Sequence, residues 1–393
     1  MEKNNKKPRI RFKGFTNAWE QRKLGEEASE ILAGGDINKE KLVEKGKFPV
    51  YANALINNGI VGYYNEYYRV KAPAVTITGR GEIGHAVARN VNFTPVVRLL
   101  TLKSKHNIYF LENAINNINV VSESTGVPQL TVPQVSNYNI YFPKKIEEEI
   151  KIGQYFKQLN NLITLHQRKC DSLIMIKKAL LEKMFPKNGE NYPEIRFRGF
   201  TDAWEQRKLG EIGTTYTGLS GKSKEDFGHG NAKFVTYMNV YSNPIAKIEG
   251  TENVEIDDSQ NKVQYGDAFF TTSSETPDEV GMSSVWLENT DNVYLNSFCF
   301  GYRPTEKIYP YYLGYMLRSE AMREKLIFLA QGISRYNISK NKVMEIKISL
   351  PKYEEQVKIG NFFKHLENLI TLHQRKLEKL KNIKKSLLEK MFV

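Results

Sequence analysis

The residues of this sequence that could do chemistry are polar and aromatic side chains in two stretches, 27–142 and 212–350, which are broken by Gly, Asn and Pro. Arg, Asn and Gln side chains match the edges of bases in the major groove, while Ser, Lys and Tyr commonly hold phosphates. Each of these residue types is also ordinary in surface loops. The candidates for contact with a nucleic acid are Asn57, Asn58, Tyr63, Arg80, His85, Gln129, Tyr237, Asn239, Ser273, Ser274, Arg335 and Tyr336.

The segment Gly79–Gly84 (GRGEIG) matches the G-x-G-x-x-G pattern of dinucleotide-binding loops. That fingerprint also requires a helix directly afterwards and an acidic residue about 20 positions later. Residues 85–95 are strand-like instead, and no Asp or Glu stands between Glu82 and Glu112. We therefore interpret the segment as a glycine-rich turn that presents Arg80.

Other matches to catalytic motifs are incomplete. Pro277–Asp278 resembles the start of a nuclease carboxylate motif, but its nominal partner Glu345–Lys347 lies too far along the chain. Asn243–Ile245 does not meet the Asn-Pro-Pro-aromatic signature of amino-methyltransferases, and neither a P-loop nor a nucleophilic triad spacing occurs. Cys170 and Cys299 are too few for a zinc site or a disulfide framework. We expect no catalytic residue, no metal site and no cofactor in this chain.

The elements that would position these residues are present twice. Residues 10–26 and 195–211 differ at two of seventeen positions, and residues 151–185 and 358–392 differ at ten of thirty-five. We call 10–26 and 195–211 the opening blocks, and 151–185 and 358–392 the closing blocks. The stretch between each opening block and the closing block that follows it is not visibly repeated. This order predicts one scaffold that carries two different recognition surfaces.

Each closing block reads as one long amphipathic helix. Its apolar residues alternate spacings of four and three, the heptad pattern of a coiled coil. Lys177 interrupts the first pattern, where we expect the neighbouring Ile176 to cover the seam. A helix of this length, roughly 50–60 Å at about 1.5 Å per residue, cannot bury its stripe alone. The predicted seam residues are Phe156, Leu159, Ile163, His166, Leu173, Leu180, Phe363, Leu366, Ile370, His373, Leu380 and Leu387.

The closest partner for each helix is its copy in the same chain. Because the chain returns through a whole domain between them, an antiparallel pair is the economical arrangement. His166 and His373 lie on the seam without Cys or carboxylate residues at ligand spacing. We interpret them as a polar layer that sets the register rather than as a metal site.

The intervening stretches predict α+β domains. Short β-like runs stand at 74–78, 96–100, 268–272 and 297–300. One helix is expected around 107–118 and one around 310–330, followed by similar turns at 125–130 and 331–336. The predicted fold is two similar α+β domains joined by two long helices that form an antiparallel coiled coil, with a pseudo-twofold internal repeat. Its segments are domain 1 (1–143), spacer 1 (144–186), domain 2 (187–350) and spacer 2 (351–393).

Composition limits the class of protein. A chain of 393 residues suits two domains. Lys and Arg number 57 against 44 Asp and Glu, a net charge of +13, which is compatible with a polyanionic partner but does not establish one. Mean hydropathy is −0.49, no apolar run approaches the roughly 20 residues of a membrane span, and the basic N-terminus is not a secretory signal. We expect a cytoplasmic protein with no membrane contact.

The repeated blocks resemble those of specificity subunits of type I restriction–modification enzymes. The resemblance rests on RFKGFTNAWEQRKLGE and RFRGFTDAWEQRKLGE, on the Leu350–Gln356 lead into the second helix, and on the LITLHQRK…LLEKMF helices. It covers essentially the whole chain. The first helix lead, Pro143–Glu149, departs from the pattern because it lacks the usual Glu-Gln ending, which bears on the contacts made there.

The resemblance implies a non-catalytic DNA-reading subunit with two target-recognition domains, each for one half of a bipartite, asymmetric target. The paired helices would set the gap between the halves. Partners would be double-stranded DNA, two modification subunits that form an adenine methyltransferase, and restriction subunits that add an ATP-dependent endonuclease. S-adenosylmethionine, ATP and Mg²⁺ would belong to those partners.

Two other classes of function are distinguishable from this one. A single-chain methyltransferase or nuclease would bind S-adenosylmethionine or carry a catalytic motif. A coiled-coil tether would show no salt-dependent retention on a duplex, whereas a DNA reader loses affinity steeply as salt rises. The repeat also predicts that the end of the second helix, near Phe392, lies beside the first opening block near Phe12, so that the two ends of the chain are close.

Overall fold

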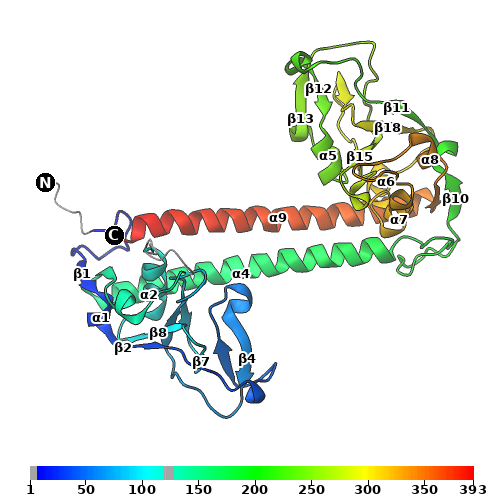
Figure 1. Cartoon of the computed structure of the whole chain (residues 1–393). Coiled ribbons are helices and arrows are strands. Elements are labelled where there is room, and N and C mark those ends of the chain that lie inside the picture. The colour runs from blue at the N-terminus through cyan, green and yellow to red at the C-terminus, as the bar shows by residue number, and fades with distance from the viewer. Residues whose placement is uncertain (1–6, 119, 121–127) are drawn as a thin grey trace. The chain divides into compact units, whose positions relative to one another are not determined.

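The computed structural model describes residues 7–118, 120 and 128–393, and Figure 1 labels many of its helices and strands. The chain forms two compact units: unit 1 comprises 1–168 with 374–393, and unit 2 comprises 169–373. Two long helices, α4 (Ile146–Lys183) and α9 (Tyr353–Met391), each belong partly to both units. Each unit therefore contains the beginning of one long helix and the end of the other.

The domain of unit 1 before α4, which we call head 1 (residues 7–142), is built on an antiparallel four-stranded sheet of order β2-β8-β5-β6. A three-stranded sheet has the order β4-β3-β7, with β3 and β7 parallel, and β1 pairs with β9. The elements are β1 (Glu20–Lys23), α1 (Leu24–Glu27), β2 (Ala28–Ala33), β3 (Phe48–Tyr51), β4 (Ile60–Tyr64), β5 (Ala74–Ile77), β6 (Ala86–Arg89), β7 (Thr94–Pro95), β8 (Leu100–Ser104), α2 (Ile108–Asn116), α3 (Val132–Ser136) and β9 (Asn139–Phe142).

The domain of unit 2 before α9, head 2 (residues 190–350), repeats this topology. Its sheets have the orders β11-β18-β14-β16, β13-β12-β17 with β12 and β17 parallel, and β10-β20. The prediction of two α+β domains of one fold is therefore confirmed. The elements are β10 (Glu205–Lys208), β11 (Gly213–Thr217), β12 (Phe227–Val235), α5 (Tyr237–Ser242), β13 (Thr251–Val254), β14 (Ala268–Thr271), β15 (Ser273–Ser274), β16 (Ser283–Val285), β17 (Val293–Leu295), β18 (Cys299–Pro304), α6 (Pro310–Met316), α7 (Glu320–Phe328), β19 (Tyr336–Asn337), α8 (Lys340–Met344) and β20 (Lys347–Leu350).

Most predicted elements of the heads are present, and two are corrected. The expected helix at 310–330 is two helices, because Ser319 accepts a hydrogen bond from the backbone of Met322 and caps a second helix. The strand expected at 96–100 begins only at Leu100, the start of β8, and 96–99 form a turn: Leu99 N–H donates to the Val96 carbonyl at 3.0 Å, and Arg98 has a φ of 68°. Part of the turn expected at 125–130 lies outside the described residues.

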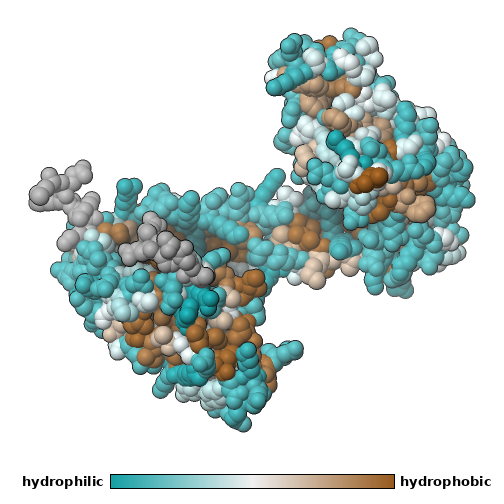
Figure 2. Space-filling model, in the orientation of Figure 1, coloured by the Kyte–Doolittle hydropathy of each residue, from teal (hydrophilic) through white to brown (hydrophobic). Residues whose placement is uncertain are grey.

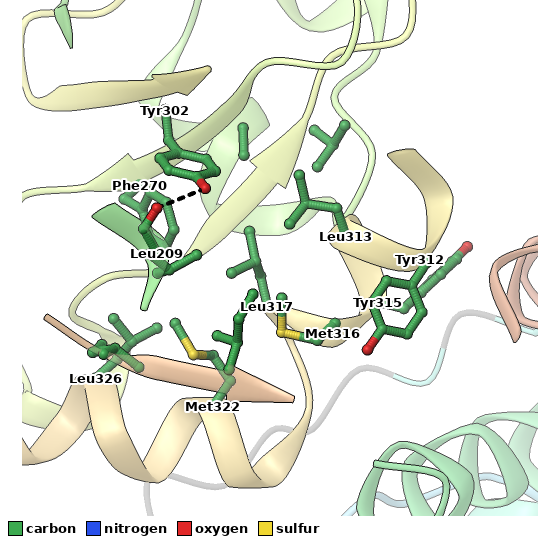
Figure 3. Close-up of a cluster of buried hydrophobic side chains, with 14 of the residues drawn as sticks. Leu209, Phe270, Tyr302, Tyr312, Leu313, Tyr315, Met316, Leu317, Met322 and Leu326 are labelled. Carbon is green, nitrogen blue, oxygen red and sulfur yellow. Dashed lines mark hydrogen bonds between the residues drawn. The ribbon is translucent and has the colours of Figure 1, made fainter. Parts of the chain in front are cut away.

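The core of unit 2 joins the head to both long helices. Phe185, just after α4, stacks on Phe363 of α9 with ring centroids 6.0 Å apart, and both belong to one buried cluster with Trp204. Figure 3 shows part of this cluster, in which the Tyr302 hydroxyl donates to the Leu209 carbonyl at 3.0 Å. Burial of these rings supplies the main stabilisation of the unit.

The core of unit 1 has the same construction. Trp19, Phe110 and Phe156 pack around Phe392, which follows the end of α9. The backbone N–H of Ile10 donates to the carbonyl of Lys390 at 2.9 Å, as Ile195 does to Lys183 in unit 2. The prediction that the end of the second helix lies beside the first opening block is confirmed.

The two long helices pack together, and they do so antiparallel within each unit. In unit 1 the start of α4 meets the end of α9, and in unit 2 the end of α4 meets the start of α9. All predicted seam side chains are buried or half-buried. The expectation that Ile176 covers the seam was wrong, because Ile176 is 48% exposed while Lys177 lies half-buried on the seam and bonds Glu367.

Candidate nucleic-acid interface

In head 1 the loop that follows β5 presents two of the predicted residues together. Its ends are joined by a hydrogen bond from Thr78 N–H to the His85 carbonyl at 3.0 Å. Within it, Arg80 forms an isolated antiparallel bridge with Gln129, and both side chains are exposed. The strand β6 follows at Ala86, so the G-x-G-x-x-G match is a turn, as predicted. This places a guanidinium and an amide side by side at the surface.

A second loop of head 1 lies against the first. Asn53 accepts a hydrogen bond from the backbone of Gly79 at 2.8 Å, and the loop that begins there carries Asn57 and Asn58. Both asparagines are exposed and have left-handed backbone conformations, with φ of 50° and 54°. Asparagine tolerates this conformation better than most residues, so a tight polar turn forms there. Tyr63, by contrast, is half-buried on β4.

His85 lies at the other end of the β5–β6 loop and is exposed. Although the residue is exposed, surrounding protein partly desolvates its ring, and this desolvation, followed by the nearby positive charges of Lys384 and Arg89, lowers the pKa of His85. At neutral pH the imidazole is therefore uncharged and can both donate and accept a hydrogen bond.

In head 2 four of the predicted residues line one pocket of about 330 Å³: Tyr237, Ser273, Ser274 and Arg335. The strands β15 and β19 build this region, because Ser273 pairs with Asn337 and Ser274 pairs with Tyr336. The remaining wall consists of Met238, Tyr241, Glu275, Glu279 and Phe298.

Hydrogen bonds fix the walls of this pocket. The Tyr237 hydroxyl donates to the Ser273 carbonyl at 2.8 Å, and the Tyr241 hydroxyl donates to Glu279 at 2.6 Å. The two rings are nearly parallel, with an interplanar angle of 16°. The hydrogen bond to Glu279, with burial, raises the pKa of Tyr241, so its hydroxyl stays protonated at neutral pH. The pocket is therefore preformed, with aromatic sides and a polar rim.

Asn239 does not contribute to this pocket. Its side chain is buried, donates to the Lys247 carbonyl at 2.7 Å and accepts from the Lys247 N–H at 3.0 Å. These bonds occupy its amide in holding the segment that follows α5. Tyr336 is half-buried and reaches the pocket region only through its pairing with Ser274.

Sequence reasoning missed several pocket residues. Tyr241 stands four positions after Tyr237, so a short helix places both on one side, and this spacing was a usable signal. Met238, Glu279 and Phe298 carried no comparable signal, because they come from segments that only the folded sheet brings together.

The repeated opening blocks form a further surface that is nearly the same in both units. In unit 2 a hollow of about 540 Å³ is lined by Arg196, 199–205, Arg207, 306–308, 350–352 and 354–356. Trp204 lies at its wall, and Trp19 is its counterpart in unit 1. The indole N–H groups of both are buried without a hydrogen-bond partner among the described residues. Buried donors without a partner are uncommon in folded proteins, and here the same one occurs in both units.

Behind this surface an arginine joins each opening block to its long helix. Arg11 donates to both oxygens of the buried Glu148 at 2.6 and 2.8 Å, and Arg196 does the same to Glu355 at 2.7 and 2.8 Å. Such paired bonds fix orientation as well as position. The opening block is therefore held rigidly on the start of the long helix in both units.

The segment Pro143–Glu149, which leads into α4, differs from its counterpart before α9, and a histidine contacts the residue that differs. Glu149 stands where the second lead has Gln356, and both accept from a backbone N–H, that of Asn107 at 3.4 Å and that of Tyr309 at 3.0 Å. His106 lies 3.0 Å from Glu149 and 2.9 Å from Glu27. In its protonated form, His106 compensates the additional negative charge of Glu149.

No group of three or more His, Cys, Asp or Glu that could hold a metal ion occurs among the described residues. The same part of the chain contains no helix that is both long and apolar enough to cross a membrane. Figure 2 shows a mainly hydrophilic surface, with hydrophobic residues gathered locally on head 1 in this view.

Comparison with known proteins identifies relatives of the whole arrangement. The family model described as the type I restriction modification DNA specificity domain matches residues 17–174 and again 201–382. The specificity subunit of the MjaVIII type I restriction enzyme of Methanocaldococcus jannaschii is 24% identical over 297 residues, which is 68% of this chain and 64% of that protein.

A Mycoplasma pneumoniae protein named as a candidate type I specificity subunit is 32% identical over 135 residues, 33% of this chain and 37% of that protein. The matched regions thus span between about a third and two thirds of the length of these relatives.

Two solved structures share the fold. The crystal structure of the specificity subunit of a type I restriction–modification system from M. genitalium has a TM-score of 0.62 at 16% identity, covering 98% of this chain and 99% of that one. A chain from a structure of a type I restriction–modification system has a TM-score of 0.51 at 16% identity, covering 96% and 98%. With the family model matched twice, once to each head and its helix, this chain belongs to the type I restriction–modification DNA specificity family.

Proposed function

We propose that this chain is the non-catalytic subunit that selects the DNA target of a type I restriction–modification complex. The observation that carries the proposal is that two heads of one topology present different polar loops after the same central strand, Arg80 with Gln129 in head 1 and the Ser273 pocket in head 2. Two heads that share a fold but carry different surface loops suit a bipartite, asymmetric target, in which each head reads one half.

The net charge of +13 supports contact with the phosphate backbone. In this proposal the segments 1–143 and 187–350 read bases, while 144–186 and 351–393 form the spacer that fixes the gap between the half-sites. The predicted DNA contacts within each head remain predictions. The chemistry belongs to partners: methyl transfer to adenine with S-adenosylmethionine, and cleavage driven by ATP and Mg²⁺ in restriction subunits.

The direct test is to map methylated adenines in cells that carry the complex and to measure binding of the purified complex to the target found. Selective binding should fall steeply with salt, with a slope set by the number of phosphates contacted. The isolated chain should not bind S-adenosylmethionine in a calorimetric titration. Binding of S-adenosylmethionine by the chain alone would indicate that the chain is itself an enzyme. Absence of all duplex binding would indicate that it is a coiled-coil tether.

We further infer that the repeated surface around Trp19 and Trp204 holds two copies of one modification subunit. Exposed residues have no reason in the fold to be the same in both units, whereas two identical partners require like surfaces. Thr16 and Thr201 are equivalent exposed residues of this surface. Each single Thr→Arg variant should lose one modification subunit in native mass spectrometry, and the double variant should lose both. Unchanged stoichiometry in the double variant would place docking elsewhere.

A further inference from the structure

The registers of the two heads define equivalent positions in their loops. Ile77 at the end of β5 pairs with Leu100, and Phe270, one residue before the end of β14, pairs with Phe300. Each of Leu100 and Phe300 follows a like turn, in which an N–H donates to the carbonyl three residues earlier: Leu99 to Val96 at 3.0 Å, and Cys299 to Asn296 at 3.1 Å. Position 77 therefore corresponds to 270.

Counting on from this register, Arg80 corresponds to Ser273. Their bridge partners agree with it, because Arg80 pairs with Gln129 and Ser273 pairs with Asn337. The neighbouring backbone bonds agree as well: Leu130 N–H donates to the Gly79 carbonyl, and Ile338 N–H to the Thr272 carbonyl, both at 2.9 Å. The same place in the fold thus carries a long cation in head 1 and a small hydroxyl in head 2.

Because of this substitution, the surface projects at this place in head 1 and is hollow at the equivalent place in head 2. Arg80 is exposed and extends from head 1, whereas Ser273 is only 8% exposed and forms part of the wall of the 330 Å³ pocket in head 2. Head 1 therefore offers a side chain that can enter a groove, and head 2 offers a hollow that can receive a group from a duplex.

The apolar part of the wall of the hollow is formed by Tyr237, Met238, Tyr241 and Phe298. Phe298 is 54% exposed, so its ring stands at the mouth. The only apolar group that a base pair presents in the major groove is the C5-methyl of thymine. A methyl group in such a hollow exchanges water contact for contact with aromatic and thioether surface.

The rim of the hollow suits the rest of the same base pair. Glu275 is exposed there, and its carboxylate is an acceptor. The adenine paired with a thymine presents its N6 amino donor on the same groove edge as the methyl group. Glu279 is engaged by the Tyr241 hydroxyl, while the exposed Arg335 supplies a positive charge suited to a phosphate.

We propose that this pocket reads a T·A base pair, receiving the thymine methyl between Phe298 and the tyrosines and placing Glu275 to accept from the adenine N6 amino group. The inference rests on the proposed function, because it assigns part of the target to head 2. It names one base pair of one half-site and leaves the other positions open.

The test uses the assembled complex on its mapped target, with each thymine replaced in turn by uracil, which lacks only the methyl group. One thymine in a single half-site should show a loss of affinity of about fourfold, the effect of roughly one buried methyl. Ser273→Arg, which fills the pocket, should weaken binding and abolish the uracil effect at that position. Ser220→Arg, at an exposed serine of head 2 outside the pocket, is the matched control. It should leave both the binding affinity and the uracil effect unchanged.

Phe298→Ala keeps the test decisive if Ser273→Arg fails to fold. It removes an exposed wall and should reduce the uracil effect without loss of thermal stability. If no thymine responds to uracil while the complex still selects its target, the pocket inference is overturned and the proposed function stands. The pocket inference is equally overturned if the one sensitive thymine keeps its full uracil effect in both pocket variants. If the complex shows no selective binding to any duplex, the proposed function itself fails.

Discussion

Arg80 is the residue of head 1 whose chemistry points to a particular base. Its guanidinium is exposed on a glycine-rich turn beside the Gln129 amide. Arginine most often reads guanine, through two hydrogen bonds to O6 and N7 worth about 1–3 kcal/mol. We expect Arg80→Ala to lower discrimination at one G·C pair by roughly 10- to 100-fold in competition binding, and to leave the other half-site unaffected.

The control for this variant is Lys45→Ala, which removes an exposed cation elsewhere in head 1. Removing a cation that binds a phosphate weakens binding to every sequence alike and lowers the salt slope. Equal loss at both half-sites in Arg80→Ala would therefore show that Arg80 contacts a phosphate or supports the fold.

His106 gives head 1 a pH dependence that head 2 lacks at the equivalent lead. Burial alone lowers the pKa of His106, but its hydrogen bonds to Glu149 and Glu27 outweigh this and raise the pKa above 6.5. The stabilisation of the folded state by protonated His106 is complete below about pH 6.5. It is lost as pH rises through the raised pKa of His106 in the folded protein. The hydrogen bond from His106, with those from Arg22 and Lys105, lowers the pKa of Glu27 to about 2, so its contribution is lost as pH falls from about 4.5 toward 2.

We therefore expect head 1 to be most stable between about pH 4.5 and 6.5, as followed by thermal unfolding. His106→Gln should destabilise it by about 3 kcal/mol, because Glu149 is left buried without its cation. Adding Glu149→Gln should restore much of this loss, since a glutamine serves at the equivalent position 356. His229→Gln, at an exposed histidine, should leave stability nearly unchanged. A double variant no more stable than His106→Gln would contradict this explanation.

At the scale of elements, Gly153 shows why a glycine is present in a long helix. A Cβ at this position of α4 would stand 2.1 Å from Asn107 Oδ1, the atom that caps α2. Gly→Ala in an exposed helix stabilises by about 1 kcal/mol. At position 153 the steric clash outweighs this gain in helix stability. We therefore expect Gly153→Ala to destabilise unit 1 by about 1–3 kcal/mol in denaturant unfolding. Gln154→Ala, at the exposed neighbour, should be nearly neutral; a stabilised Gly153→Ala would contradict the packing described.

The long helices were predictable from sequence because a heptad pattern repeats over many turns and reports one buried side directly. The seam residue Lys177 was misjudged because the pattern does not record that Glu367 lies opposite it. Sheet order was not predictable, since pairing joins segments far apart in the chain. The same limit applies to the site: a glycine-rich turn predicts the exposure of Arg80, but only the sheet brings Phe298 to Ser273.

At the scale of the whole molecule, unit 1 is closed by the last helix of the chain. The Ile10–Lys390 bond and the packing of Phe392 on Trp19 hold the first opening block and the end of α9 together in unit 1. A permutant that joins residue 393 to residue 7 through a short flexible linker and opens between 186 and 193 would keep every contact of both cores. We expect it to fold and to bind the same target with an affinity within about threefold of the natural order, because exposed connections tolerate new ends.

The contrasting permutant opens between Arg168 and Lys169, inside α4. It has the same new junction, but it interrupts a helix that both units share. That variant should lose target binding and unfold at lower temperature, since a helix end created there leaves backbone groups without partners. If both permutants bind equally, α4 need not be continuous for target selection. If the first one fails while the second binds, the connection between 186 and 193, rather than the continuity of α4, is what the fold requires.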